Sequence, residues 1–443
     1  MSSTQDVIVT LLTNIGSRKE VQQYLRHYAS VSAPKFAVVR VSGRVLDQSL
    51  DSLAASLAFL REVGLVPIVV HGASPQLDRA LEDAKIAAPV VEGLRPMTRE
   101  VRDVARRVLH DANSRLVEAL EAKGTRARPF TSGVFEADAE RDARLGPVAV
   151  VQKVHDASLL AAARAGHVPV VSPLAETRDG RLLVVHADAA ASAIALAVRP
   201  HKIVYLTEEG GLTDGAGRIR SAVNLAEDRD EVLGPGAPPA TRRRLGEIAA
   251  MLERLPPTSS VSITSPDHLA RELFTHRGAG TLVRLGEHVR KVSSFAELDR
   301  ERLRALLEEC FGKRLHPGYF DDKRPFRVYL SESYRATAIL TLEDGVPYLD
   351  KFAVTPEAQG EGIGGSIWSR MRQETPKLFW RSRAENPVNP WYAQNADGLY
   401  KTDRWWVFWC GMRSFAEIGE SVARALAMPA TLKEPAPAQA VPS

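Results

Sequence analysis

Five polar and aromatic residues near the end of the chain have the types and spacing to do chemistry. Arg381, Ser382 and Arg383 end an apolar run, Asn386 lies in the turn that follows, and Tyr392 falls in an aromatic cluster. Planar guanidinium groups bind carboxylates through paired hydrogen bonds, and a phenol can donate a proton. The pattern predicts a pocket that holds carboxylates and supplies one proton.

A glycine-rich stretch upstream, 359–364, reads Gln-Gly-Glu-Gly-Ile-Gly and opens a predicted helix. Backbone N–H groups at the start of a helix attract anions, and glycine lets a pyrophosphate approach the backbone closely. An ordinary strand-to-helix turn is the alternative, but the antiparallel strands predicted around the stretch favour the phosphate loop. Anion clamp, phosphate loop and phenol together predict acyl transfer from a nucleotide thioester to an acidic acceptor.

The elements that must position these residues follow a linker at about 286–296. Apolar alternation predicts strands within 326–342, with a hairpin turn at Asp344-Gly345, and then a strand at 348–354. The glycine loop, a helix to about Glu374, and strands at 377–383 and 405–410 complete this part. We expect a compact α/β domain with mostly antiparallel strands.

The first part of the chain has a different pattern. After a helix predicted over 5–30, a strand at 36–41, a helix at 46–63 and a strand at 66–70 form a βαβ unit. Further strands are predicted at 148–151, 168–171, 203–206 and 260–263, with helices at 187–197, 241–254 and 266–274 between or after them. This alternation predicts an α/β fold with a mainly parallel sheet.

Composition narrows the class of protein. The 443 residues predict two or three domains, and the net charge of +4 comes from interleaved acids and bases, which argues against a nucleic-acid-binding stripe. Cys310 and Cys410 stand far apart, so we expect neither a disulfide framework nor a metal site. No apolar run is long enough to cross a membrane, and the N-terminus lacks the apolar core of a signal peptide. We therefore expect a cytoplasmic protein.

The C-terminal motifs carry a resemblance to a known family. The segments 348–352, 359–364, 379–383 and 405–410 resemble the vertebrate-like type of N-acetylglutamate synthase, whose catalytic domain belongs to the GNAT acetyltransferase superfamily. The resemblance runs from about Val9 to Met412. It implies transfer of an acetyl group from acetyl-CoA to the α-amine of L-glutamate, the entry step of arginine biosynthesis, without a metal or a tightly bound cofactor.

The resemblance also implies site residues. Those expected to bind acetyl-CoA are Phe352, Ala353, Val354, Gln359, Gly360, Gly362, Gly364 and Gly365. Those expected to bind glutamate are Lys313, Lys351, Arg381, Ser382, Arg383 and Asn386. Tyr392 matches the tyrosine that acts as general acid on the departing thiolate. Without the resemblance, Tyr392 could equally be an aromatic residue of the core. Arg381 and Arg383 could likewise be a pair of surface residues.

The N-terminal part resembles the amino-acid kinase fold of N-acetylglutamate kinase, with its site altered. The family's Lys-x-Gly-Gly stands here as 40–43, Arg-Val-Ser-Gly, and its His-Gly-Gly-Gly-Pro as 71–75, His-Gly-Ala-Ser-Pro. Val184 replaces an asparagine, and Arg244 falls where a lysine is expected, while Asp188 and Arg95 match. Phosphoryl transfer depends on placed cations and close backbone approach, so we expect kinase activity to be absent or vestigial.

These observations predict an α/β chain in three parts. Residues 1–288 form an amino-acid-kinase-like three-layer sandwich with a regulatory role, 289–427 form the GNAT domain, and 428–443 form a disordered tail. The family implies a homo-oligomer, a tetramer by analogy, and feedback by L-arginine bound through the helix containing Tyr24 and the segment 267–280. A bifunctional synthase and kinase, or a non-catalytic arginine sensor, are the alternatives.

Overall fold

The computed structural model describes residues 36–91, 94–142, 146–214, 217–256, 259–274, 279–356, 358–359 and 362–433. By its internal contacts the chain divides between Leu285 and Gly286 into two compact units. The expected helix at 5–30, with Tyr24, lies outside the described residues. None of the helices in the described ranges is long and apolar enough to cross a membrane.

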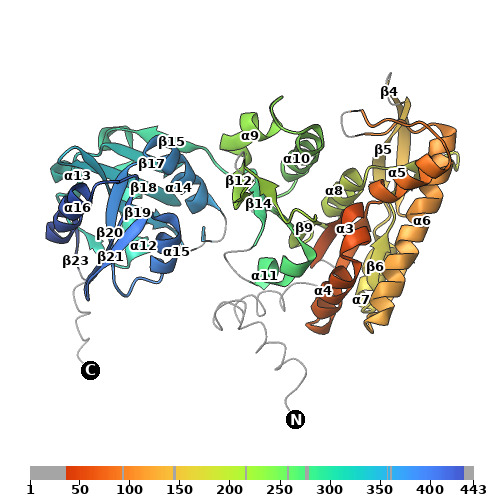
Figure 1. Cartoon of the computed structure of the whole chain (residues 1–443), viewed down its shortest axis with the longest axis horizontal. Coiled ribbons are helices and arrows are strands. Elements are labelled where there is room, and N and C mark those ends of the chain that lie inside the picture. The colour runs from red at the N-terminus through yellow and green to blue at the C-terminus, as the bar shows by residue number, and fades with distance from the viewer. Residues whose placement is uncertain are drawn as a thin grey trace, which may run out of the picture. The chain divides into compact units, whose positions relative to one another are not determined.

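Unit 1, residues 1–285, is built on an eight-stranded sheet (Figure 1). In spatial order the strands are β12 (Ala222–Asn224), β14 (Thr281–Arg284), β13 (Val261–Thr264), β9 (Lys202–Leu206), β1 (Ala37–Val41), β2 (Pro67–His71), β6 (Val168–Val171) and β3 (Ala127–Phe130). Every described pairing in this sheet is parallel except that of β13 with β14. The mainly parallel sheet expected from the sequence is therefore present.

Helices cover both faces of this sheet. They are α3 (Gly43–Gln48), α4 (Leu50–Glu62), α5 (Ser74–Asp83), α6 (Arg99–Ala122), α7 (Ala157–Arg164), α8 (Ala187–Val198), α9 (Leu225–Leu233), α10 (Pro239–Leu252) and α11 (Leu269–Phe274), with a 3-10 turn at Pro266–His268. Val39 joins a core with α4 and α6, whereas Val38 joins a core with α8. Neighbouring strand residues point to opposite faces, so the unit has the predicted three layers.

Two predicted elements of unit 1 differ in detail. The helix expected over 46–63 is two helices, because Ser49 leaves the helical conformation between α3 and α4. The strand expected at 148–151 belongs to β5 (Gly146–Val154), which pairs antiparallel with β4 (Phe135–Asp142) in a separate sheet. That sheet has the order β5-β4-β7-β8, with β7 at Leu174–Glu176 and β8 at Leu182–Val184. A small ribbon pairs β10 (Leu212–Thr213) with β11 (Ile219–Arg220).

Unit 2, residues 286–443, has a seven-stranded sheet of mixed direction. In spatial order its strands are β15 (Val289–Val292), β17 (Arg327–Ser331), β18 (Ala336–Glu343), β19 (Val346–Val354), β20 (Leu378–Arg383), β22 (Trp405–Cys410) and β21 (Gly398–Lys401). Only β19 and β20 run parallel among these pairs; the other pairings are antiparallel. The hairpin between β18 and β19 turns at Asp344 and Gly345, both with positive φ, as the sequence predicts.

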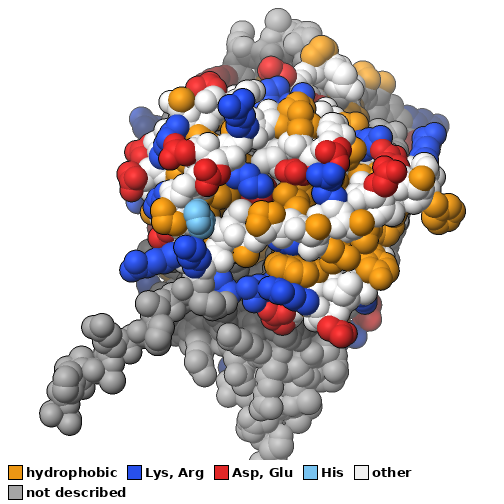
Figure 2. Space-filling view, turned by 90° about the vertical axis from the view of Figure 1, so that its left-hand side faces the viewer, with side chains coloured by type: hydrophobic (Ala, Val, Ile, Leu, Met, Phe, Trp, Pro, Cys, Tyr) orange, Lys and Arg blue, Asp and Glu red, His pale blue; other side chains and the backbone are white. Residues whose placement is uncertain are grey.

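The helices of unit 2 pack on the two faces of this sheet. They are α12 (Arg300–Phe311), α13 (Tyr319–Asp322), α14 (Ile363–Glu374), α15 (Asn389–Asn395) and α16 (Phe415–Ala427), with a 3-10 turn at Phe295–Glu297. One core joins α14 and α15 to Trp380 and Phe408. On the other face α12 packs over Ile339, and α16 packs over Phe379. Figure 2 shows a face of this unit on which basic and acidic side chains are interspersed.

The first residues of the expected disordered tail are ordered. Strand β23 (Leu432–Lys433) pairs antiparallel with β16 (Arg314–Leu315), and Leu432 packs against the core that contains α12. Backbone pairing and one buried leucine outweigh the Ala/Pro-rich composition, so the prediction of disorder is wrong for residues 428–433. We call this segment, 428–433, the C-terminal strap. Residues 434–443 lie outside the described residues.

Candidate active site

The parallel strands β19 and β20 share a single paired position, Tyr348 opposite Phe379. Beyond it, β19 continues to Val354 and stays paired with β18 on its other side. Residues 351–354, which include the predicted cofactor-binding Phe352, Ala353 and Val354, therefore have no paired strand on the β20 side. An extended chain can add to such an open strand edge through backbone hydrogen bonds. The gap between β19 and β20 offers a place for the arm of a thioester cofactor.

Tyr392 lies on α15 and is buried, with 6% of its surface exposed. Its ring packs against Trp380 of β20 at 5.5 Å between centroids and against Phe352 of β19 at 6.5 Å. The phenol thus lies beside both β19 and β20, near the point where the two strands diverge. Burial raises the pKa of Tyr392, so its proton stays in place at neutral pH, and its hydroxyl forms no hydrogen bond with a described residue. The phenol therefore carries the proton that a general acid must donate.

The glycine loop enters α14 as predicted. Gly362 caps the helix with φ of 81°, a left-handed conformation that glycine adopts easily. A side chain at Gly364 would place its Cβ 2.8 Å from Cγ2 of Val354, so glycine here lets the helix pack closely on β19. Gln359 donates from Nε2 to the carbonyl of Val354 at 3.4 Å, and Gly365 faces open space. Gly360 lies outside the described residues.

Strand β20 divides the predicted glutamate residues between two faces. Ser382 and Trp380 alternate onto the Tyr392 face, where Ser382 Oγ accepts a hydrogen bond from Asn386 Nδ2 at 2.9 Å. Asn386 Oδ1 in turn accepts from the backbone N–H of residue 388 at 3.2 Å, which holds the turn. Arg381 and Arg383 share the opposite face, as the sequence predicts, and both lie near the ring of Trp405, at 4.2 and 5.8 Å.

The side chain of Arg381 binds carbonyl groups at the C-terminal end of α16. Its guanidinium donates to the carbonyl oxygens of Ala425 at 2.8 Å and Pro429 at 3.0 Å. Free carbonyls at a helix C-terminus carry partial negative charge and are a common partner for arginine. Arg383 is exposed and lies 3.7 Å from Glu385. The two arginines therefore do not form the empty carboxylate clamp that their spacing suggests.

Lys351 is buried in a compact polar network on the same face as Arg381. Its Nζ donates to the carbonyl and to Oδ2 of Asp350 and, at 2.7 Å, to Oγ1 of Thr431 in the C-terminal strap. Those three bonds use all three donors of an ammonium group. Asp350 also accepts from the hydroxyl of Tyr319 at 2.6 Å and lies 3.8 Å from Lys323.

The charges in this network favour an anion. Burial alone would raise the pKa of Asp350, but Lys351 and Lys323 outweigh it and lower that pKa. Two lysines face one carboxylate, so one positive charge is left to attract a ligand. Lys313 directly precedes β16, the strand that pairs with the strap. Lys313, Lys351 and Arg381, three of the four cations predicted to hold glutamate, thus all adjoin the C-terminal strap or the strand that it pairs with.

Sequence reasoning missed Asp350, Tyr319, Lys323 and Thr431. Asp350 could have been suspected, because it precedes a predicted site lysine in a strand that is otherwise apolar. Nothing in the local sequence of Thr431 indicates a partner eighty positions earlier.

Unit 1 holds a second buried cluster at the kinase-like positions. Arg40 of β1 lies 2.6 Å from Asp188 of α8, and both side chains are almost fully buried. Arg243 and Arg244 of α10 approach the same carboxylate at 3.6 and 3.9 Å. His186 Nδ1 lies 2.9 Å from a guanidinium nitrogen of Arg243. The structure therefore brings together Arg40, Asp188 and Arg244, which sequence comparison singled out at separate places.

Electrostatics fix the charge state of this cluster. Burial opposes ionisation of Asp188, but Arg40 and its neighbours outweigh it and lower the pKa to about 2. Burial lowers the pKa of His186 to about 4, so the imidazole is neutral at pH 7. Three guanidinium groups around one carboxylate leave an excess of positive charge. Each arginine is partly held by Asp188.

The altered loop at 71–75 is packed into the fold. The methyl group of Ala73 joins the apolar core with α4 and α6, and α5 begins at Ser74. A side chain at Gly43 would meet Cδ of Pro75 at 2.8 Å, so the two loops that follow β1 and β2 lie in close contact. Val184 ends β8, and Arg95 donates to the carbonyl of Ala88 and to Asp78.

Two family models match the two parts of the chain. Residues 35–234 match the amino acid kinase family, and residues 290–427 match the N-acetyltransferase of N-acetylglutamate synthase. Acetylglutamate kinase of Xylella fastidiosa is 44% identical over 419 residues, which cover 94% of this chain and all of that protein. The chain belongs to the N-acetylglutamate synthase and kinase family. Unit 2 is accordingly the acetyltransferase part of this family member and unit 1 its amino-acid kinase part.

Two further proteins are similar to this chain over most of its length. The mitochondrial N-acetylglutamate synthase of Homo sapiens is 34% identical over 428 residues, which cover 95% of this chain and 77% of that protein. The crystal structure of N-acetylglutamate synthase from Neisseria gonorrhoeae, complexed with coenzyme A and N-acetyl-glutamate, has a TM-score of 0.58 and 21% identity, covering 89% of this chain and 98% of that one. The same enzyme with coenzyme A and L-arginine has a TM-score of 0.55. At this identity the likeness shows the fold.

Proposed function

We propose that unit 2 transfers the acetyl group of acetyl-CoA to the α-amine of L-glutamate. The observation that carries the proposal is the gap between β19 and β20, with the phenol of Tyr392 beside it. The glycine loop at the start of α14 adjoins the same strand. A cofactor arm in the gap therefore has a phosphate loop at one end and a proton donor near its thioester.

The cofactor is held mainly by backbone. Phe352, Ala353 and Val354 pair with the amide groups of the pantetheine arm, as a further strand would. Gln359, Gly360, Gly362, Gly364 and Gly365 surround the pyrophosphate, where N–H groups at the helix start favour negative charge. This assignment needs no metal ion.

The chemical step follows from these positions. The neutral α-amine of glutamate attacks the thioester carbonyl, a C–N bond forms and the C–S bond breaks. Tyr392 donates its proton to the departing sulfur, which leaves as the thiol of coenzyme A. The attacking nitrogen releases one proton to solvent as the amide forms, and a proton from solvent restores the phenol. The amine must lose a proton before attack, and nearby cations favour its neutral form.

Glutamate is held through its carboxylates on the face of the C-terminal strap. Lys351 is saturated in the free enzyme, so a substrate carboxylate must replace one of its partners. The hydroxyl of Thr431 is the uncharged side-chain partner and is the one replaced, because a charge-assisted bond is stronger than a neutral one. Lys313, Arg381 and Arg383 belong to the proposed glutamate site on this face, with Arg381 also anchoring α16. Ser382 and Asn386 complete the site from the Tyr392 face of β20.

The direct test is an assay of thiol release with acetyl-CoA and a panel of amino acids. We expect turnover with L-glutamate and little with aspartate or glutamine. Aspartate has a shorter distance between its two carboxylates, and glutamine has an amide in place of the side-chain carboxylate. Acetyl-CoA binding without turnover on any amino acid would refute the proposal and favour a sensor role.

A second activity deserves a test because the Xylella relative is named acetylglutamate kinase. We propose that this chain lacks that activity, since Arg40 and Arg244 stand at lysine positions and are drawn onto Asp188. Losing one placed donor costs ~10²–10³ in rate. An ADP-release assay with ATP and N-acetylglutamate is expected to show no turnover above background, and ordinary turnover would establish a bifunctional enzyme.

We further propose that unit 1, with a boundary near residue 288, regulates unit 2 in a homo-oligomer and binds L-arginine. The structure of the Neisseria enzyme with L-arginine supports this idea by analogy. A thermal shift with saturating L-arginine is the expected result, with L-lysine as the control ligand. Absence of any shift would count against the effector, and sedimentation would give the number of subunits.

A further inference from the structure

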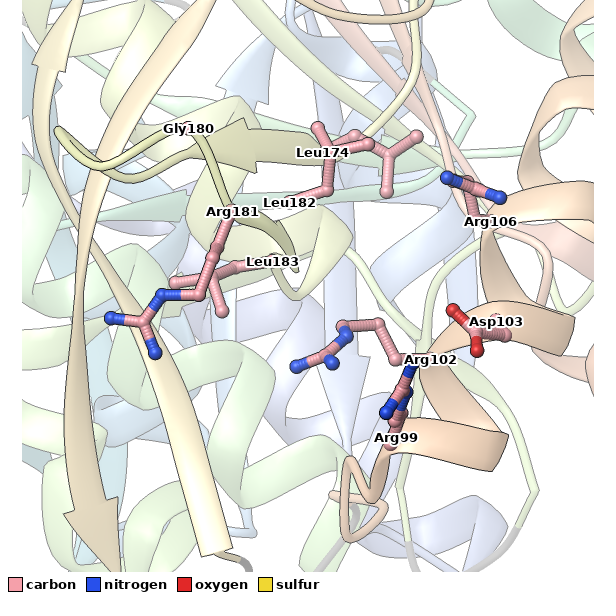
Figure 3. A pocket seen from close by; sticks show the side chains of 9 residues that line it. All are labelled: Arg99, Arg102, Asp103, Arg106, Leu174, Gly180, Arg181, Leu182 and Leu183. Carbon is pink, nitrogen blue, oxygen red and sulfur yellow. The ribbon is translucent and has the colours of Figure 1, made fainter.

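A cavity of about 290 Å³ in unit 1 lies between the start of α6 and the β7–β8 hairpin (Figure 3). The residues that line it are Arg99, Arg102, Asp103, Arg106, Leu174, Gly180, Arg181, Leu182 and Leu183. Four of these side chains are guanidinium groups and one is a carboxylate, so the wall carries a net charge of +3. Such an excess around one small space requires an explanation.

Three of the arginines form a stripe along one face of α6. Arg99, Arg102 and Arg106 are three and four positions apart, which places them on the same side of a helix. In Figure 3 the side chain of Arg102 extends from α6 toward the hairpin, with Arg181 on the other side of the space. Basic side chains from two separate elements therefore border one cavity.

Little in the described structure balances this charge. The guanidinium groups of Arg102 and Arg106 form no hydrogen bond or ion pair with any described residue, and Arg181 pairs with Asp179 at 2.8 Å. Like charges three and four positions apart repel each other on a helix, and cations in its first turn oppose the helix dipole. Asp103, four positions after Arg99 and three before Arg106, supplies one counter-charge, and an anion bound between the arginines would offset the remaining repulsion.

The hairpin side of the cavity contributes leucines as well as Arg181. Leu174 and Leu183 are buried, with 4% and 6% of their surface exposed, and Leu182 lies between Leu183 and Arg181 on the hairpin. Guanidinium groups bind phosphates and carboxylates through paired hydrogen bonds. A space bordered by guanidinium groups from both elements and by leucines suits a ligand with two or more negative charges on a small organic body.

We propose that this cavity binds a small organic polyanion, a phosphate or polycarboxylate of at most about mononucleotide size. None of its lining residues belongs to the Asp188 cluster of unit 1 or to the acetyl-transfer site proposed for unit 2. The cavity is therefore an additional site, and its occupancy is measured by binding, independently of catalysis.

Isothermal titration calorimetry on the full chain tests the proposal, with excess coenzyme A present to fill the glycine loop. The probes are pyrophosphate, adenosine monophosphate and glutarate, and adenosine is the uncharged control. The decisive variant is Arg102→Gln combined with Arg106→Gln. Its control is Arg107→Gln, which removes one positive charge from an exposed residue of α6 outside the cavity.

We expect at least one anion to bind the wild type, the double variant to bind it at least ~10-fold more weakly, and the Arg107 variant to bind it normally. Binding of the phosphates alone identifies a phosphate site, and binding of glutarate alone a carboxylate site. A thermal midpoint of the double variant no lower than that of the wild type shows that it folds. Equal affinity in the wild type and the double variant, or no binding of any anion, overturns the proposal.

Discussion

Each unit of the molecule buries one aspartate among cations, and the two clusters differ in what surrounds them. In unit 1, Asp188 is enclosed by Arg40, Arg243 and Arg244. In unit 2, Asp350 contacts Lys351, Lys323 and the hydroxyl of Tyr319. Both groups contain more positive than negative charge, so both could attract an anion.

The strands beside the clusters behave differently. Arg40 lies in β1, which is paired along its whole length with β2 and β9. Lys351 lies in β19 just past the single position where β19 and β20 are paired. A cofactor can enter an open strand edge but not a sheet that is paired on both sides. The comparison teaches that the two clusters differ in access to the backbone: the strand of Lys351 has an unpaired edge at which a cofactor could pair, and the strand of Arg40 has none.

The largest expected effect concerns the Asp188 cluster of unit 1. Asp188→Asn leaves the buried guanidinium of Arg40 and the half-buried ones of Arg243 and Arg244 without their counter-charge, which should lower the free energy of unfolding of unit 1 by about 3–5 kcal/mol. All six tryptophans lie in unit 2. Urea unfolding should therefore show an earlier transition by circular dichroism and an unchanged one by tryptophan fluorescence. The exposed Asp179→Asn is the control, and an Asp188→Asn curve matching the wild type would contradict a structural role.

The next largest effect concerns the rate of acetyl transfer at the site proposed for unit 2. Tyr392→Phe keeps the ring packing and removes the proton donor, so kcat for acetyl transfer should fall about 10²-fold, with the KM for glutamate little changed. The measurement is thiol release at several pH values, because loss of a general acid also alters the pH profile. Tyr400→Phe, at a half-exposed tyrosine of the same unit, is the control. An unchanged kcat would remove Tyr392 from the mechanism.

A buried histidine should make unit 1 the more acid-sensitive of the two. Burial lowers the pKa of His71 to about 4, from an ordinary value of 6.5. Because the unfolded chain binds the proton more tightly, stability is lost as pH falls from about 6.5 toward 4, by about 2 kcal/mol at pH 5. His71→Asn should reduce that loss, and the exposed His110→Asn should not. Unfolding by circular dichroism at pH 7.5 and pH 5 measures the difference.

The smallest predicted effect concerns the C-terminal strap. Thr431→Val removes the hydroxyl that accepts a hydrogen bond from Lys351. The substrate carboxylate then no longer competes with a bond of roughly 1 kcal/mol. The KM for glutamate should therefore fall about fivefold, while kcat stays the same. Thr431→Ser keeps the hydroxyl and should behave like the wild type. A raised KM in Thr431→Val would instead show that Thr431 orients Lys351 for its substrate.

Much of the fold could be predicted from local pattern. The strands near 36–41, 66–70 and 348–354 and the hairpin turn at Asp344-Gly345 follow from apolar runs and turn chemistry, and the structure has them. The strand near 148–151 was placed in the wrong sheet. Apolar alternation indicates that a strand exists, but its neighbour depends on contacts with segments far away in sequence.

The arrangement of the candidate site could also be predicted only in part. The sequence indicates that Arg381 and Arg383 share a strand face, because side chains alternate along any strand. It does not indicate that the carbonyls of Ala425 and Pro429 occupy Arg381. Those carbonyls come from the end of α16, and only the packing of that helix on the sheet brings them to the strand.

The sequence by itself determined the residue types of the proposed chemistry: the arginines and serine of 381–383, the phenol of Tyr392 and the glycines of 359–365. It also determined the local elements that carry them, since periodicity and turn residues act over a few positions. The tertiary structure alone decided that β19 and β20 part after Tyr348, that Tyr392 stands beside the gap, and that Thr431 holds Lys351. The reason is that burial and hydrogen bonding join segments far apart in the chain, and no local pattern encodes which segments will meet.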